Sequence, residues 1–312
     1  MSEVHLEKPV TESPPYQAKA NWRESAFWAF LGEFAENKTA LVAAIVFLAI
    51  ALAAILAPWI VPQDPYDLAN LSILDSRLAP GTQAMDGTTY WLGTDGLGRD
   101  VLSAIVYGLR ISLAVGALSS VFALIIGTVV GLIAAYIGGR TDAFLMRLVD
   151  LQMSFPAILI ALILLAVLGR GVDKTMIALI AVQWAYYART VRASALVERE
   201  REYIEAARSL RLGHSRILSR HLLPNCLAPL IVVVTVQMAS AITLEATLSF
   251  LGVGLPETEP SLGLLIANGY QYLLSGAYWI SIFPGIALLV VIVAINLVGD
   301  RLRELLNPSM QR

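Results

Sequence analysis

The chain has 312 residues, of which 57% are hydrophobic and 15% charged, and its mean hydropathy is +0.68. Soluble domains carry about 25% charged residues, so this composition indicates a polytopic membrane protein. The net charge of −2 argues against a nucleic-acid partner, and a single cysteine, Cys226, excludes an internal disulfide or a cysteine-ligated metal centre.

The first 39 residues are polar and contain Pro14 and Pro15. They hold no short apolar core followed by a small-residue cleavage site, so we do not expect a signal peptide. Aromatic residues recur between Trp22 and Phe34. This pattern fits either an amphipathic helix at the membrane surface or a short helix that leads into the first span. We treat residues 1–39 as a cytoplasmic segment and 40–312 as the membrane domain.

A helix needs about 20 mostly apolar residues to cross a bilayer. We therefore predict an all-α protein with six transmembrane helices, at residues 40–61, 109–137, 148–168, 175–187, 227–254 and 278–298. The fourth is the shortest and most polar. Pro156 should kink the third span, because proline removes a helical hydrogen bond. Gly127 and Gly131 should let another helix approach the second span closely.

Lysine and arginine accumulate on the cytoplasmic side of membrane proteins. With the N-terminus in the cytoplasm, few basic residues fall outside: Arg77, Arg99, Arg110, Arg170 and Lys174. Both termini are then cytoplasmic, and residues 62–106 form an external segment. Asp100 is positioned to cap a short helix that begins at Val101.

An arginine-rich loop, residues 189–225, separates the fourth and fifth spans. Each arginine at the bilayer centre costs about 2.5–3.5 kcal/mol, so this loop must lie outside the lipid. We expect two short helices joined at Gly213, the second ending before Pro224. The less polar face of the first should carry Tyr203, Ala206, Ala207 and Leu210. Such an elbow suits either a docking element or a solvated loop near anionic lipid.

The sequence contains no phosphate-binding loop and no hydrolase or metalloprotease motif. Glu245, deep in the fifth span, is expected either in a translocation cavity or inter-subunit contact, or as a structural carboxyl hydrogen-bonded between helices. Asp150 follows Arg147 at a spacing that allows an ion pair on one helix face, which favours a structural role.

The loop resembles the EAA loop of permease subunits in bacterial ABC importers. Glu205, Ala206 and Ala207, with Leu223 and Pro224, match that motif. Arg211 stands where the family usually has glycine, and we expect Gly213 to supply the turn instead.

Further stretches resemble the second permease subunit of the dipeptide/oligopeptide/nickel subfamily, of the dipeptide-permease C type. They are Leu92–Asp100, Tyr107–Leu113, Asp150 with Ser154 and Pro156, Arg220–Asn225, and Glu245–Gly254. The resemblance extends from about Asn37 to Pro308, and the order of these motifs makes it specific.

This resemblance implies a type I ABC importer (MetI-like) permease fold in a bacterial inner membrane. Its partners would be a homologous second permease, two ATPase subunits that bind ATP and Mg²⁺, and an external solute-binding protein. The chain itself would have no catalytic residue, cofactor or metal. ATPase coupling would fall to Glu205, Ala206, Ala207, Arg211 and Gly213.

The resemblance also implies that Asp95, Arg99 and Asp100 contact the binding protein or brace the external loop. Glu245 and Asp150 would line the pathway or an inter-subunit contact. The implied cargo is a di- or oligopeptide, with nickel complexes, oligosaccharides or glutathione as alternatives. A stand-alone secondary transporter or channel is the alternative class, but it would need more midplane charges than Glu245.

Overall fold

A computed structural model describes residues 22–306, apart from 66, 68–70, 85–86 and 257, so most of the expected N-terminal segment lies outside the described residues. The elements are α1 Trp22–Glu36, α2 Lys38–Ile55, α3 Ala57–Ile60, a 3₁₀ turn Ile73–Asp75, β1 Thr82–Gln83, β2 Thr89–Tyr90, α4 Val101–Ile137, α5 Gly139–Met153, α6 Ala157–Leu168, α7 Val172–Arg199, α8 Glu202–Ser209, α9 His214–Ile217, a π-helical turn Leu218–Leu222, α10 Leu223–Phe250, α11 Leu262–Tyr270, a 3₁₀ turn Leu273–Ser275 and α12 Trp279–Leu306.

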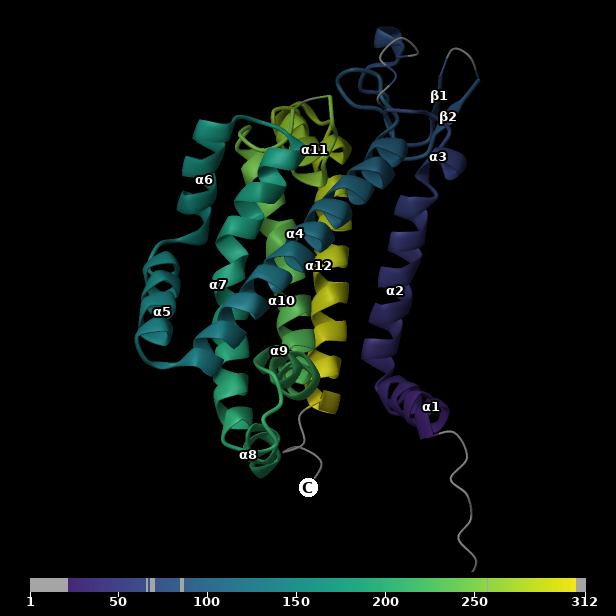
Figure 1. Ribbon diagram of the computed structural model, residues 1–312. Coiled ribbons are helices and arrows are strands. Elements are labelled where there is room, and N and C mark those ends of the chain that lie inside the picture. The colour runs from purple at the N-terminus through teal and green to yellow at the C-terminus, as the bar shows by residue number, and fades with distance from the viewer. Residues whose placement is uncertain (1–21, 66, 68–70, 85–86, 257, 307–312) are drawn as a thin grey trace, which may run out of the picture.

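The long helices form one bundle with two distinct ends (Figure 1). α1, α8 and α9 lie at the end where α12 finishes, and α3, α11 and the β1–β2 hairpin lie at the opposite end. α4 crosses the bundle diagonally and packs along α7. This arrangement separates the arginine-rich segment from the expected external segment.

Four helices are long and apolar enough to cross a membrane, and the bent pair α5–α6 makes a fifth candidate. The four are α2, α4, α12 and the continuous helix His214–Phe250, which contains α10. α7, the expected fourth span, is 28 residues long but carries internal polar groups such as Gln183 and Arg189. Its polar side chains therefore explain why composition supports four to five spans rather than all six.

Two boundaries illustrate how local chemistry shapes the bundle. Asp100 caps α4 as expected, with its carboxylate accepting from the backbone N–H of Ser103 at 2.8 Å, but that helix runs on for 37 residues rather than being short. The kink at Pro156 is confirmed, because α5 and α6 meet there at 89°. The missing proline N–H removes the bond that would have continued the helix.

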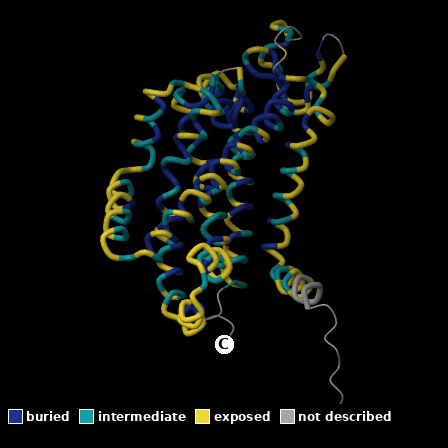
Figure 2. The backbone as a smooth tube through the Cα atoms, viewed as in Figure 1, coloured by how far each residue is buried: buried dark blue, intermediate teal, exposed yellow. Residues whose placement is uncertain are grey.

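Close packing of α4 on α7 depends on two glycines. A Cβ at Gly127 would lie 2.5 Å from the Cβ of Tyr187, and one at Gly131 would lie 2.5 Å from the carbonyl oxygen of Ala188. The expected close approach is therefore confirmed, and α7 is the helix that approaches. Buried residues concentrate in the centre of the bundle, while the outer faces of α2, α5 and α6 are largely exposed (Figure 2). The exposed faces of α2 and α6 are apolar.

Candidate functional site

The arginine-rich segment folds as an elbow, which we define as residues 200–222. α7 continues to Arg199, so the elbow begins later than the expected loop boundary at 189. In α8, Ile204 and Ala207 are buried, whereas Glu205, Ala206 and Leu210 are exposed. Of the residues expected on the less polar face of this helix, Ala207 is buried, but Tyr203, Ala206 and Leu210 are exposed and do not share its packed position. Ile204 takes that place because it packs into a core cluster with α4 and α7.

The turn after α8 is made by Arg211 and not by Gly213. Arg211 has a φ of +53°, in the left-handed region that glycine occupies without strain. Gly213 has a φ of −60° and serves as the N-cap of α9. Arg211, at the position where the EAA motif resemblance leads us to expect glycine, thus has the positive φ that glycine adopts without strain.

The second part of the elbow does not end before Pro224. The π-helical turn Leu218–Leu222 runs directly into α10, and Pro224 sits in the first turn of that helix. Proline has no backbone N–H to donate, and it lies where the π-helical turn already interrupts the regular α-helical hydrogen-bond pattern. The second part of the elbow and α10 are therefore one continuous helix from His214 to Phe250.

Three contacts tie the elbow and the adjoining end of α7 to the end of α4. Arg199 donates to the carbonyl oxygen of Ala135 at 2.8 Å, and the hydroxyl of Tyr136 meets Nδ1 of His214 at 2.5 Å. The guanidinium of Arg208 lies 5.8 Å from the centre of the Tyr136 ring. Sequence reasoning missed Tyr136, because nothing in its apolar span indicates that it reaches a loop far along the chain.

Tyr203 links the elbow to both flanking helices. Its hydroxyl donates to the carboxylate of Glu198 at 2.7 Å and accepts from the side-chain amide of Asn225 at 3.0 Å. Partial burial, together with the neighbouring Glu198 carboxylate, raises the pKa of Tyr203 to about 12. The phenol therefore stays protonated at physiological pH and keeps donating this bond.

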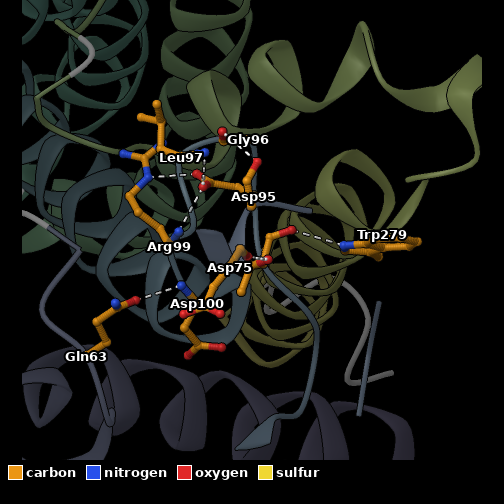
Figure 3. Close-up of polar contacts among 10 residues, drawn as sticks. Gln63, Asp75, Asp95, Gly96, Leu97, Arg99, Asp100 and Trp279 are labelled. Carbon is orange, nitrogen blue, oxygen red and sulfur yellow. Dashed lines mark hydrogen bonds and ion pairs between the residues drawn. The ribbon is translucent and has the colours of Figure 1, made fainter. Parts of the chain in front are cut away.

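At the opposite end of the bundle, Asp95 and Arg99 form a buried ion pair at 2.7 Å (Figure 3). The other oxygen of the Asp95 carboxylate accepts from the backbone N–H groups of Leu97 and Arg99, at 2.8 and 3.0 Å. Both side chains are therefore occupied within the loop. Their geometry matches the bracing alternative and leaves them little surface for a partner.

Asp100 is also buried and joins the external segment to the bundle. Its backbone N–H donates to the side-chain oxygen of Gln63 at 2.7 Å, and its carboxylate caps α4 (Figure 3). The indole N–H of Trp279 donates to the carbonyl oxygen of Thr94 at 3.1 Å, which ties the same loop to α12. No pattern in the sequence indicates that Gln63 and Trp279 contribute to this brace.

Glu245 is completely buried between helices. Its carboxylate accepts hydrogen bonds from the hydroxyls of Ser112 in α4 at 2.9 Å and Ser249 in α10 at 2.7 Å. In this conformation the residue lines no cavity among those found in the described residues. Its contacts are those of a structural carboxyl that connects two helices.

Asp150 pairs with Arg189 of α7 and not with Arg147, so the expected ion pair within one helix is wrong. The bend at Pro156 leaves α5 beside α7, which brings the guanidinium of Arg189 within reach. A second pair, Arg192 with Asp142, joins the same two helices. Within the described ranges, no group of three histidine, cysteine or acidic residues is arranged to hold a metal ion.

Comparison with known families gives two matches. Residues 127–312 match the family described as the binding-protein-dependent transport system inner membrane component. Residues 25–80 match the family described as the N-terminal transmembrane domain of oligopeptide transport permease C. Together these ranges include the elbow, Glu245 and Asp150, but they leave out the Asp95–Asp100 loop.

Curated relatives cover most of the chain. A putative peptide transport system permease protein of Brucella suis is 43% identical over 267 residues, which is 86% of each chain. The dipeptide transport system permease protein DppC of Alkalihalophilus pseudofirmus is 37% identical over 98% of this chain and 97% of its own. The inward-facing MetNI methionine ABC transporter has a chain that aligns with a TM-score of 0.55 and 22% identity, covering 66% of this chain and 97% of that one. That likeness shows a shared fold.

Proposed function

Because the chain belongs to the family of binding-protein-dependent transport system inner membrane components, we propose that it is one permease half of an ABC importer for di- or oligopeptides. It is a multi-pass membrane protein of the transport permease type. The observation that carries the peptide assignment is similarity over 98% of the chain to a dipeptide permease. A homologous second permease would complete the pathway, and a separate solute-binding protein would deliver the cargo.

In this proposal the elbow is the contact with the ATPase subunits, which bind ATP and Mg²⁺ and carry out the hydrolysis. Support comes from its geometry: Ile204 and Ala207 anchor α8 in the chain's own core, which leaves Glu205 and Ala206 exposed at the end of the bundle. The basic residues around it favour placing this end, with both termini, on the cytoplasmic side of the inner membrane. Closure of the ATPases would then move the elbow and α10 together.

The external segment would face the solute-binding protein. Since Asp95, Arg99 and Asp100 are buried, their part would be to hold the shape of that surface from beneath. Exposed apolar groups at this end, such as Trp91 and Leu97, are better placed for direct contact. A rigid surface favours binding here, because a preorganised surface loses less conformational entropy when a folded partner binds.

The coupling assignment is tested with Glu205→Arg and Ala206→Trp in the complete complex. We expect either change to release the ATPase subunits or to leave ATP hydrolysis without peptide uptake. Glu259→Arg, at the opposite end of the bundle, is a matched control that should retain both. Ala207 is unsuitable for this test, because a larger side chain there would disturb the chain's own core. Normal uptake with ATPases bound in both variants would refute the assignment.

An ABC importer and a secondary transporter use different energy sources for uptake, and uptake into reconstituted vesicles distinguishes the two. An ABC importer takes up a labelled dipeptide when ATP is present in the ATPase compartment and the ion gradients are collapsed. A secondary transporter loses uptake under that condition and keeps it when a gradient replaces ATP. Co-purification of a second permease, ATPases and a binding protein would support the same conclusion, and screening that binding protein would separate peptides from nickel complexes, oligosaccharides and glutathione.

A further inference from the structure

A pocket of about 630 Å³ opens between α7, α10 and α12, at the end of the bundle that holds the elbow. Gln237 lies midway along α10, so the pocket extends from the middle of the bundle to the last turn of α12. Its walls are mainly apolar and include Pro229, Val232 and Val236. A concave, mostly apolar cavity with a few polar groups is the usual form of a small-ligand site.

The polar groups of this pocket are few and differ in kind. Gln237 is mostly buried and lines the pocket, and its side-chain amide makes no hydrogen bond within the described residues, although the amide itself is not fully enclosed. Its backbone oxygen is held by the side chain of Gln183 at 3.0 Å, so the residue has a fixed position. An amide that lines a pocket and has no protein partner is available to hydrogen-bond a ligand there.

The pocket carries one uncompensated positive charge. Arg189 and Arg303 both line it, but Arg189 is neutralised by Asp150. Arg303 forms no ion pair in the part of the chain that the structure describes. One anionic group is therefore the complement of this rim, and a guanidinium binds a carboxylate particularly well.

We propose that this pocket binds a short peptide, with the peptide carboxylate at Arg303, a backbone amide at Gln237 and apolar side chains against the valines of α10. The inference rests on the proposed function and names the residues that would recognise the transported peptide. An anionic phospholipid would satisfy Arg303 as well. Its acyl chains, however, would leave the Gln237 amide against hydrocarbon, which is unfavourable.

The test uses the complete complex in nanodiscs without the binding protein, and a dipeptide that carries a benzophenone side chain. We expect light-induced crosslinks to α10 between residues 228 and 237 or to α7 between residues 186 and 190. An unlabelled dipeptide should compete, and its C-terminal amide should compete about tenfold less well, since a charge-assisted hydrogen bond is lost. Crosslinks elsewhere, or a retained phospholipid that the dipeptide does not displace, would overturn the proposal.

Two variants and one control sharpen the result. In Arg303→Gln the free acid and its amide should compete equally, which a merely structural role would not produce. Gln237→Leu should weaken binding of both forms alike. Arg140→Gln, an exposed arginine outside the pocket, should behave as the wild type. Retained discrimination in Arg303→Gln would overturn the inference even if Gln237→Leu did not fold.

Failure of this inference is distinguishable from failure of the proposed function. ATP-driven dipeptide uptake by the wild-type complex, together with crosslinks outside the pocket, would leave the importer function intact and refute only the binding site. Absence of ATP-driven uptake in a fully assembled complex would instead refute the function on which the inference rests.

Discussion

The carboxylate of Glu245 in α10 accepts a hydrogen bond of 2.9 Å from the hydroxyl of Ser112 in α4, inside the bundle. Ser249 provides a second bond to the same carboxylate. Glu245→Leu should therefore lower the stability of the purified complex by about 1–3 kcal/mol, because two buried hydroxyls lose their acceptor. Glu245→Gln keeps one acceptor oxygen and should cost less. Equal melting temperatures for both variants would contradict this role.

The contact between α4 and α7 predicts a sharp difference between two glycines. Gly127→Ala should cost about 1–3 kcal/mol, because the added methyl group would meet the backbone of α7. Gly285 lies in α12, and an added methyl group there would meet no atom within 4 Å apart from its chain neighbours and the backbone of its own helix. Gly285→Ala should therefore be neutral or stabilising by up to about 1 kcal/mol. Thermal unfolding of the two variants in detergent checks the contrast, which a loss of stability in both would refute.

The left-handed backbone conformation of Arg211 predicts that a substitution there can increase the stability of the elbow. Arg211→Gly should stabilise the elbow by about 1 kcal/mol, since glycine takes a positive φ without strain. The same replacement at Arg216, within α9, should instead cost about 1 kcal/mol, because glycine weakens a helix. Hydrogen exchange of the backbone between residues 202 and 217 measures both effects. Faster exchange in Arg211→Gly would show that the arginine side chain stabilises the turn by other means.

The Asp95–Arg99 ion pair beneath the external surface predicts a large loss of stability when one partner is removed. Asp95→Ala should destabilise the outer loop by about 3–5 kcal/mol, because it leaves the Arg99 guanidinium buried and unpaired. Limited proteolysis of residues 90–100 from the outer side should then become rapid. Asp173→Ala, at an exposed carboxylate of the same end, serves as the control and should change stability by less than about 1 kcal/mol. Unchanged protease resistance in Asp95→Ala would refute the bracing role.

Patterns within one segment were predictable from the sequence, and contacts between distant segments were not. The cap at Asp100, the bend at Pro156 and the close approach at Gly127 follow from local chemistry that each residue carries alone. The partner of Asp150 did not, because helical spacing pointed to Arg147 while the bend brought Arg189 near. Likewise, the hydroxyl of Tyr136 finds His214 only once α4 and the elbow have packed together.

The elbow also shows where a motif misleads. The glycine at position 213 was the natural choice for the turn, yet the backbone reverses at Arg211, two residues earlier. The residue type sets which backbone conformations have a low free energy. The packing of Ile204 and Ile217 in the core determines where the chain turns. The unpaired amide of Gln237 could not be foreseen either, since polar residues in apolar spans usually find partners.

The unbroken helix from His214 to Phe250 gives the molecule a lever. At a rise of 1.5 Å per residue it is about 55 Å long, so a tilt of about 10° would displace one end relative to the other by about 10 Å. The π-helical turn Leu218–Leu222 joins α9 directly to α10 without an intervening loop, so such a swing would pass from the elbow into α10. A displacement of a few ångströms at the elbow would therefore move the α10 wall of the pocket at Gln237 first, and then the buried carboxylate of Glu245.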